Sequence, residues 1–302
     1  MSHSHAHASA RRPLAIALGL ILGLMVGEIV FGFVAGSLAL LADAGHMLTD
    51  AAALALALVA ASLAGRPARG RWTFGFRRLE ILAAHVNGVT LLVVGVVIVY
   101  TAVRRLVDPP EVRGGIVLAV ALAGIAVNLV AAALLHRPSR DSLNVRGAFL
   151  HVATDLVAFI GTAVAGALIL VTGWDRFDPI AGLLVAGLMF WGAYGLLRES
   201  TRIFLEVAPT NIQPDAVGRA LCEEPDVVEV HDLHVWTLTD GFPVASAHVL
   251  VAPGADCHAI RERLEQRLAQ LFGLEHSTLQ VEHARGPVQI GPSFRRQSPL
   301  RR

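Results

Sequence analysis

The sequence predicts an all-α membrane domain of six transmembrane helices followed by a small cytoplasmic α+β domain. Of the 302 residues, 54% are hydrophobic and only 16% are charged, and the mean hydropathy is +0.59. A soluble protein covers its surface with more polar side chains than this composition supplies. The apolar residues are concentrated before about residue 200, and the rest of the chain has the mixed polarity of a soluble domain.

Six stretches are apolar enough to cross a membrane, which takes roughly 20 residues of helix. They are residues 14–36, 38–64, 79–103, 114–136, 145–172 and 178–198. An even number of spans places both chain ends on one side of the membrane. The predicted domain limits are a His-containing tail at 1–13, the six-span domain at 14–204, the α+β domain at 205–286 and a disordered tail, rich in Pro, Gly and Arg, at 287–302.

The distribution of arginine predicts the orientation of the spans. Arginines are concentrated in the amino-terminal tail and in the second and fourth connections, at positions 11, 12, 66, 69, 71, 77, 78, 137, 140 and 146. The opposite loops hold four arginines, which are partly offset by four acidic residues. Because positive loops stay in the cytoplasm, we predict a protein of the cytoplasmic (inner) membrane with both termini in the cytoplasm.

Short elements follow residue 205. We predict a helix at 215–223, strands at 227–239 and 243–251, an amphipathic helix at 256–272 and a strand at 277–284. The dipeptides Asp240-Gly241 and Pro253-Gly254 are typical of turns. The order αββαβ predicts a ferredoxin-like α+β sandwich.

Charge and cysteine content narrow the class of protein further. The net charge of +1 gives no reason to expect a nucleic-acid partner. The two cysteines, Cys222 and Cys257, both lie in the soluble part and do not make a disulfide framework.

Two of the predicted spans contain a histidine followed four residues later by an aspartate. The second span contains LADAGHMLTD and the fifth contains FLHVATD, so the four residues are His46, Asp50, His151 and Asp155. At about 3.6 residues per turn, each pair lies on one face of its helix. All four lie roughly 9 to 18 Å into their spans, so they can meet near the middle of the bilayer.

Two imidazoles and two carboxylates match the ligand preference of zinc. Carboxylates are costly inside a membrane unless they are neutralised, and a dication with two neutral imidazoles brings this cluster to zero charge. When the metal leaves, protons take its place at the same atoms, which predicts metal/proton exchange. The alternative for each pair is a hydrogen bond that only holds helices together.

Other polar residues in the spans can surround this site and orient its ligands. They are Glu28, Asp43, His85, Asn87 and Asn128. Asp43 shares a helical face with His46 and Asp50. The alternative for each of these residues is an ordinary hydrogen bond between helices.

Four segments are distinctive in combination. They are GSLALLADAGHMLTD at 36–50, RWTFGFRRLEILAAHVNG at 71–88, the His151 and Asp155 pair, and VHDLHVWTLTDG at 230–241. With these segments the chain resembles the zinc-type branch of the cation diffusion facilitator family. The resemblance implies six spans, cytoplasmic termini, a homodimer and a cytoplasmic αββαβ domain. It also implies proton-coupled export through His46, Asp50, His151 and Asp155.

The chain departs from that family pattern in two places. Some members hold a second metal in the loop after the second span, but the loop here, GRPARGRWTFGFRR, offers no ligand, and we predict no metal there. Some members hold structural zinc in the cytoplasmic domain, and the matching positions are His231, His248 and His283, with Cys257 or His258 as additions. Arg285 stands where some members have an aspartate, and its charge repels a metal.

The cytoplasmic histidines therefore form either a structural zinc site or a set of packed side chains. His231 and His234 flank Asp232, and strand alternation sends them to opposite faces, so they do not chelate together.

The sequence thus predicts an exporter of cytoplasmic zinc, with cadmium or cobalt as further substrates, in exchange for protons. Zinc is its transported ion and its only candidate structural ion, and no organic cofactor is expected. A membrane metallohydrolase is disfavoured because the chain has no H-E-x-x-H string. The second alternative is a membrane-bound metal sensor that does not transport.

Overall fold

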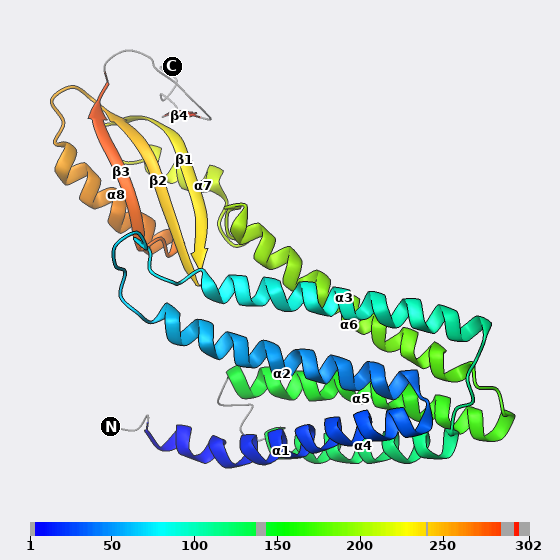
Figure 1. Cartoon of the computed structure of the whole chain (residues 1–302). Coiled ribbons are helices and arrows are strands. Elements are labelled where there is room, and N and C mark those ends of the chain that lie inside the picture. The colour runs from blue at the N-terminus through cyan, green and yellow to red at the C-terminus, as the bar shows by residue number, and fades with distance from the viewer. Residues whose placement is uncertain (1–3, 137–142, 240, 285–292, 296–302) are drawn as a thin grey trace, which may run out of the picture. The chain divides into compact units, whose positions relative to one another are not determined.

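A computed structural model describes residues 4–136, 143–239, 241–284 and 293–295 (Figure 1). Within those ranges, the side chains of residues 4–18, 61, 134–136, 143–154, 293 and 295 are outside the description. The chain divides into two compact units. One holds Met1–Leu56 and Val86–Leu196, and the other holds Ala57–His85 and Leu197–Arg302.

Long helices make up the membrane part of the described chain. They are α1 (Ser4–Ala35), α2 (Leu38–Ala64), α3 (Leu79–Val107), α4 (Gly114–His136), α5 (Leu143–Thr172) and α6 (Phe177–Phe204). Over the described residues, five of them, α2 to α6, are long and apolar enough to cross a membrane. The described apolar part of α1, Gly19–Ala35, is shorter. A helical domain of the transmembrane type is therefore confirmed. That α1 also crosses the membrane, which would make six spans, stays a prediction.

Three helices extend beyond their predicted limits by a helical turn or more. Helix α1 begins at Ser4, inside the stretch predicted as a tail, and α3 and α6 continue to Val107 and Phe204. The charged residues near these ends, such as Arg104 and Arg202, end the apolar stretch but are good helix formers. Hydropathy therefore located the spans but not the ends of these helices.

Helices α4 and α5 approach each other closely because glycines leave room between them. A Cβ atom on Gly124 would lie 2.2 Å from the ring of Phe159, and one on Gly166 would lie 2.8 Å from the backbone nitrogen of Leu118. Small residues at such crossings are typical of helix packing in membranes. This contact holds α5, which carries His151 and Asp155, against its neighbour.

The start of α2 is bound by a buried carboxylate from α6. Asp178 accepts hydrogen bonds from the Ser37 hydroxyl at 2.5 Å and from the backbone N–H groups of Leu38 at 2.6 Å and Ala39 at 3.3 Å. The Arg105 guanidinium lies 3.7 Å from the same carboxylate. The first N–H groups of a helix have no partner inside it, and the helix dipole favours an anion at this end. Asp178 therefore fixes where α2 begins.

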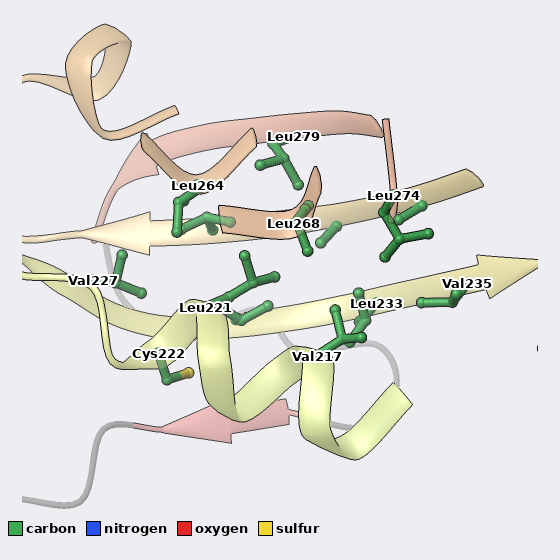
Figure 2. Close-up of a cluster of buried hydrophobic side chains, with 14 of the residues drawn as sticks. Val217, Leu221, Cys222, Val227, Leu233, Val235, Leu264, Leu268, Leu274 and Leu279 are labelled. Carbon is green, nitrogen blue, oxygen red and sulfur yellow. The ribbon is translucent and has the colours of Figure 1, made fainter. Parts of the chain in front are cut away.

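The α+β part has its elements in the predicted order. They are α7 (Pro214–Cys222), β1 (Val227–Thr239), β2 (Phe242–Val251), α8 (Cys257–Phe272) and β3 (His276–His283), followed by β4 (Ser293–Arg295). The sheet order is β3-β2-β1-β4, with β2 and β3 parallel and the other neighbours antiparallel. Figure 2 shows Leu221 of α7 and Leu264 and Leu268 of α8 packed with strand residues such as Val227 and Leu279. A small α+β domain is confirmed.

Strand β4 gives residues 293–295 a defined place within the stretch that we predicted as a disordered tail. Phe294 pairs with Val230 of β1, and its ring occupies the space that Gly218 leaves, because a Cβ there would lie 2.3 Å from the ring. Its carbonyl accepts a hydrogen bond from the Cys222 thiol at 3.2 Å. Burial raises the pKa of the Cys222 thiol, which keeps it protonated as a donor. The amino-acid composition of the tail does not show that Phe294 packs against Gly218.

Replacing Asp178 tests the anchor at the start of α2. We expect Asp178→Ala to lower the free energy of unfolding by about 1 to 3 kcal/mol, because buried donors lose their acceptor. Thermal unfolding in detergent micelles measures this, with the exposed Asp108→Ala as the matched control. Equal unfolding temperatures for the two variants would contradict the anchor.

Candidate metal site between α2 and α5

His46 lies between the carboxylates of two helices. Its Nε2 atom is 3.6 Å from Oδ2 of Asp50, one turn further along α2, and 3.9 Å from Oδ1 of Asp155 on α5. The side chain of Asp155 is buried, whereas His46 and Asp50 are partly exposed. The acidic faces of α2 and α5 therefore meet at one imidazole.

His151 lies on α5 one turn before Asp155, but its side chain is outside the described residues. Among the side chains that are described, no three His, Cys, Asp or Glu residues are arranged to hold one metal ion. His46 lies within 4 Å of Asp50 and of Asp155, so three of the four predicted ligands are neighbours. The complete four-ligand set stays a prediction.

A buried acidic pair lies beside these residues. Glu28 of α1 is 0% exposed and Asp43 of α2 is 2% exposed, and the two carboxyl groups are close enough to interact with each other. Both carboxyl groups are close enough to Asp155 for its negative charge to repel them when they are ionised. Because ionised carboxylates only accept hydrogen bonds, a bond between two carboxyl groups requires a proton on one of them. The pair is therefore a place where a proton can be held near His46.

The other predicted neighbours are placed differently. Asn128 is buried and donates to the carbonyl of Gly124 in its own helix, α4, at 3.0 Å. Asn87 is half-buried on α3. Nδ1 of His85 lies 2.9 Å from the Ser200 hydroxyl of α6, which is a contact between helices. A role for Asn87 and Asn128 in orienting metal ligands stays a prediction.

The three histidines predicted as zinc ligands in the α+β domain lie in two separate places. His231 and His248 are direct partners in the β1 and β2 register, with ring centroids 5.3 Å apart. On β3, the Nε2 atom of His283 is 3.0 Å from the Ala255 carbonyl oxygen and 3.7 Å from the Cys257 sulfur. The structure therefore does not gather His231, His248 and His283 at one point of the described domain. Arg285 lies outside the described residues.

An irregularity in β1 separates His231 from His234. The register with β2 shifts between these two residues, and Asp232 has a φ of 53°, in the left-handed region. His231 is buried, whereas His234 is exposed and lies 3.1 Å from the Asp232 carboxylate. The two histidines therefore lie in different surroundings, at an irregular point of the strand.

Arg77 and Arg78 make contacts that their charge and position in the sequence did not predict. In the structure the Arg78 guanidinium is 2.9 Å from a Glu206 carboxylate oxygen. The Arg77 guanidinium lies 4.8 Å from the ring centroid of Phe242, and its carbonyl accepts a hydrogen bond from Thr239 at 3.1 Å. The partners are far away in the sequence, so no local pattern could have indicated these contacts.

Comparison with protein families assigns both parts of the chain. Residues 14–205 match the cation efflux transmembrane domain, and residues 209–284 match the cytoplasmic domain of cation efflux proteins. The chain belongs to the cation efflux family. It is therefore a cation transporter and not an enzyme, and the resemblance to the cation diffusion facilitators is confirmed.

Curated relatives of this family align over nearly the whole chain. Zinc transporter ZitB of Escherichia coli (strain K12) is 42% identical over 292 residues, which covers 94% of this chain and 93% of that protein. The cadmium, cobalt and zinc/H(+)-K(+) antiporter of Bacillus subtilis (strain 168) is 36% identical over 287 residues, covering 93% and 92%. A solved structure, the metal-bound C-terminal domain of the CzcD transporter from Cuprividus metallidurans, is 30% identical and covers 24% of this chain and 99% of its own, with a TM-score of 0.23.

Two substitutions at Glu28 test whether it shares a proton with Asp43 in a hydrogen bond. We expect Glu28→Gln to unfold close to the wild-type temperature, because the amide can donate to Asp43 in place of the shared proton. Glu28→Leu should lower the free energy of unfolding by about 1 to 3 kcal/mol, since Asp43 stays buried without that partner. Thermal unfolding in detergent compares them, and equal losses in both variants would exclude the bond.

Proposed function

We propose that this cation efflux protein exports zinc from the cytoplasm in exchange for protons, with cadmium and cobalt as further substrates. The observation that carries the proposal is the position of His46 between Asp50 of α2 and Asp155 of α5. The names of the relatives, a zinc transporter and a cadmium, cobalt and zinc/H(+)-K(+) antiporter, support the same choice of ions. In this proposal both termini are cytoplasmic, and α1 crosses the membrane together with α2 to α6, which gives six spans.

The proposed transport site consists of His46, Asp50, His151 and Asp155. Two nitrogen and two oxygen ligands suit the tetrahedral coordination of zinc, whereas an all-oxygen set would favour magnesium or manganese. Helices α2 and α5 each contribute one imidazole and one carboxylate. Moving these helices as a packed unit would expose the site to one side of the membrane and then to the other.

Charge explains why protons would be exchanged for the metal. Asp155 and Asp50 both lie within 4 Å of His46. The carboxyl groups of Glu28 and Asp43 are also close to Asp155. So many acidic groups between helices attract a dication and repel one another when it is absent. Protons that enter from the outside would neutralise the same atoms, so metal and protons compete. Glu28 and Asp43 are in this proposal the groups next to the ligands that hold such a proton.

We also propose that the protein works as a homodimer through its cytoplasmic domain. This domain matches the cytoplasmic domain of cation efflux proteins. The pair of His231 and His248 and the pair of His283 and Cys257 each offer two ligands, whereas structural zinc takes four. A second subunit could supply the missing ligands, which would make zinc a structural ion of the dimer.

Replacing Asp50 tests transport. We expect Asp50→Ala to reduce zinc uptake into inside-out proteoliposomes to the background rate, because the proposed site loses one of its two carboxylate ligands. Wild-type uptake should rise with an imposed proton gradient and should move protons in the opposite direction. The exposed Asp108→Ala is the control. Wild-type protein that binds zinc but never accumulates it would instead be a sensor.

Replacing His46 tests the choice of ion. His46→Asp exchanges a nitrogen ligand for an oxygen ligand, so we expect zinc uptake to fall relative to manganese uptake, by about tenfold or more. Competition between the two ions in the same proteoliposomes measures the ratio. An unchanged ratio would mean that His46 does not contact the transported ion.

A further inference from the structure

The connection between α2 and α3 is basic and aromatic. Residues 65–78 contain five arginines and no acidic residue. Trp72 and Phe74 are 59% and 55% exposed. Both ends of the connection continue directly into spanning helices, α2 at Ala64 and α3 at Leu79. The connection is therefore tethered at its two ends to the surface of the membrane.

The backbone of this connection is folded on itself. Arg69 and Trp72 form a β-bridge, and the Trp72 carbonyl accepts a hydrogen bond from the Gly75 N–H at 3.0 Å. Gly75 has a φ of 66°, and a Cβ there would lie 3.4 Å from the carbonyl oxygen of Arg66. The rings of Trp72 and Phe76 are 4.9 Å apart. A turn built in this way presents its side chains in a defined arrangement.

Its arginines fall into two groups. Arg77 and Arg78 contact Phe242 and Glu206, as described above. Arg66, Arg69 and Arg71 are exposed, and no carboxylate in the described part of the chain forms an ion pair with them. The second group therefore has its charges available, next to the exposed rings of Trp72 and Phe74.

We propose that residues 66–74, the amino-terminal part of this connection, bind the headgroup of an anionic phospholipid. Guanidinium groups recognise phosphate by paired hydrogen bonds. Basic residues immediately beside a spanning helix are attracted to anionic lipid, and aromatic rings settle at the level of the headgroups. The tether at both ends brings Arg69 and Arg71 to the cytoplasmic leaflet, where such lipids are their nearest phosphate.

Trp72 provides a local reporter for this binding. The chain has four tryptophans, so the W174F/W191F/W236F variant leaves Trp72 as its only one. Titrating this full-length variant in detergent with brominated phosphatidylglycerol should quench its fluorescence at a lower lipid concentration than brominated phosphatidylcholine does. Native mass spectrometry of lipid bound to the wild-type protein gives the same comparison without the tryptophan substitutions.

Removing two charges should weaken the site in a graded way. Each arginine near the surface contributes about fivefold to anionic lipid binding, so R69Q/R71Q should raise the phosphatidylglycerol concentration at half-quenching by about thirtyfold. Quenching by phosphatidylcholine should not change. Arg219→Gln, an exposed arginine on α7, is the matched control and should behave as the unsubstituted reporter.

Three results would overturn the proposal. The first is equal quenching by the two lipids, and the second is an R69Q/R71Q variant that binds phosphatidylglycerol as the reporter does. The third is displacement of the lipid by an equal concentration of inorganic phosphate, which would make the turn a site for free phosphate. None of these measurements uses transport, so they stand or fall independently of the proposed zinc export.

Discussion

The clustering of buried carboxyl groups between α1, α2 and α5 is the constraint on which the site depends. Glu28, Asp43 and Asp155 are almost entirely buried, and Asp50 is brought near Asp155 by their common contact with His46. Carboxylates in such surroundings must be neutralised by protons or by a metal ion, because the cost of several bare charges exceeds what packing returns. A transporter can use that requirement, since the two neutral states differ only in which cation is present.

The rest of the helical unit holds these acids in place. Asp178 and Arg105 bind the start of α2, and Gly124 and Gly166 let α4 approach α5 closely. These contacts fix the start of α2 and the packing of α5, the helices that carry the His and Asp pairs. Buried Asp178 is balanced by Arg105 and by backbone donors, whereas Asp50 and Asp155 both lie within 4 Å of the imidazole of His46. Asp178 and the acids near His46 therefore differ in the groups that they contact.

Features that repeat along the chain could be predicted from the sequence, whereas contacts between distant segments could not. The spacing of His46 and Asp50 indicated a shared helical face, and alternation in 227–251 located two strands within a residue of their limits. Asp178 begins the predicted span at 178–198, but its role could not be predicted because its partners lie about 140 positions earlier. Phe294 was assigned to a disordered tail, since its docking place on Gly218 depends on the fold and not on composition.

Arginine illustrates the same limit in the connection between α2 and α3. Counting its positive charges was sufficient to predict a cytoplasmic side, and that count treats all five residues alike. The structure separates them by geometry, because Arg77 and Arg78 meet Phe242 and Glu206 of the second unit while Arg69 and Arg71 face outward on a turn. One half of the connection thus joins α3 to the α+β domain, and the other half is the part that we propose binds anionic lipid. Lipid composition could then influence the same segment that contacts the cytoplasmic domain, without any change at His46.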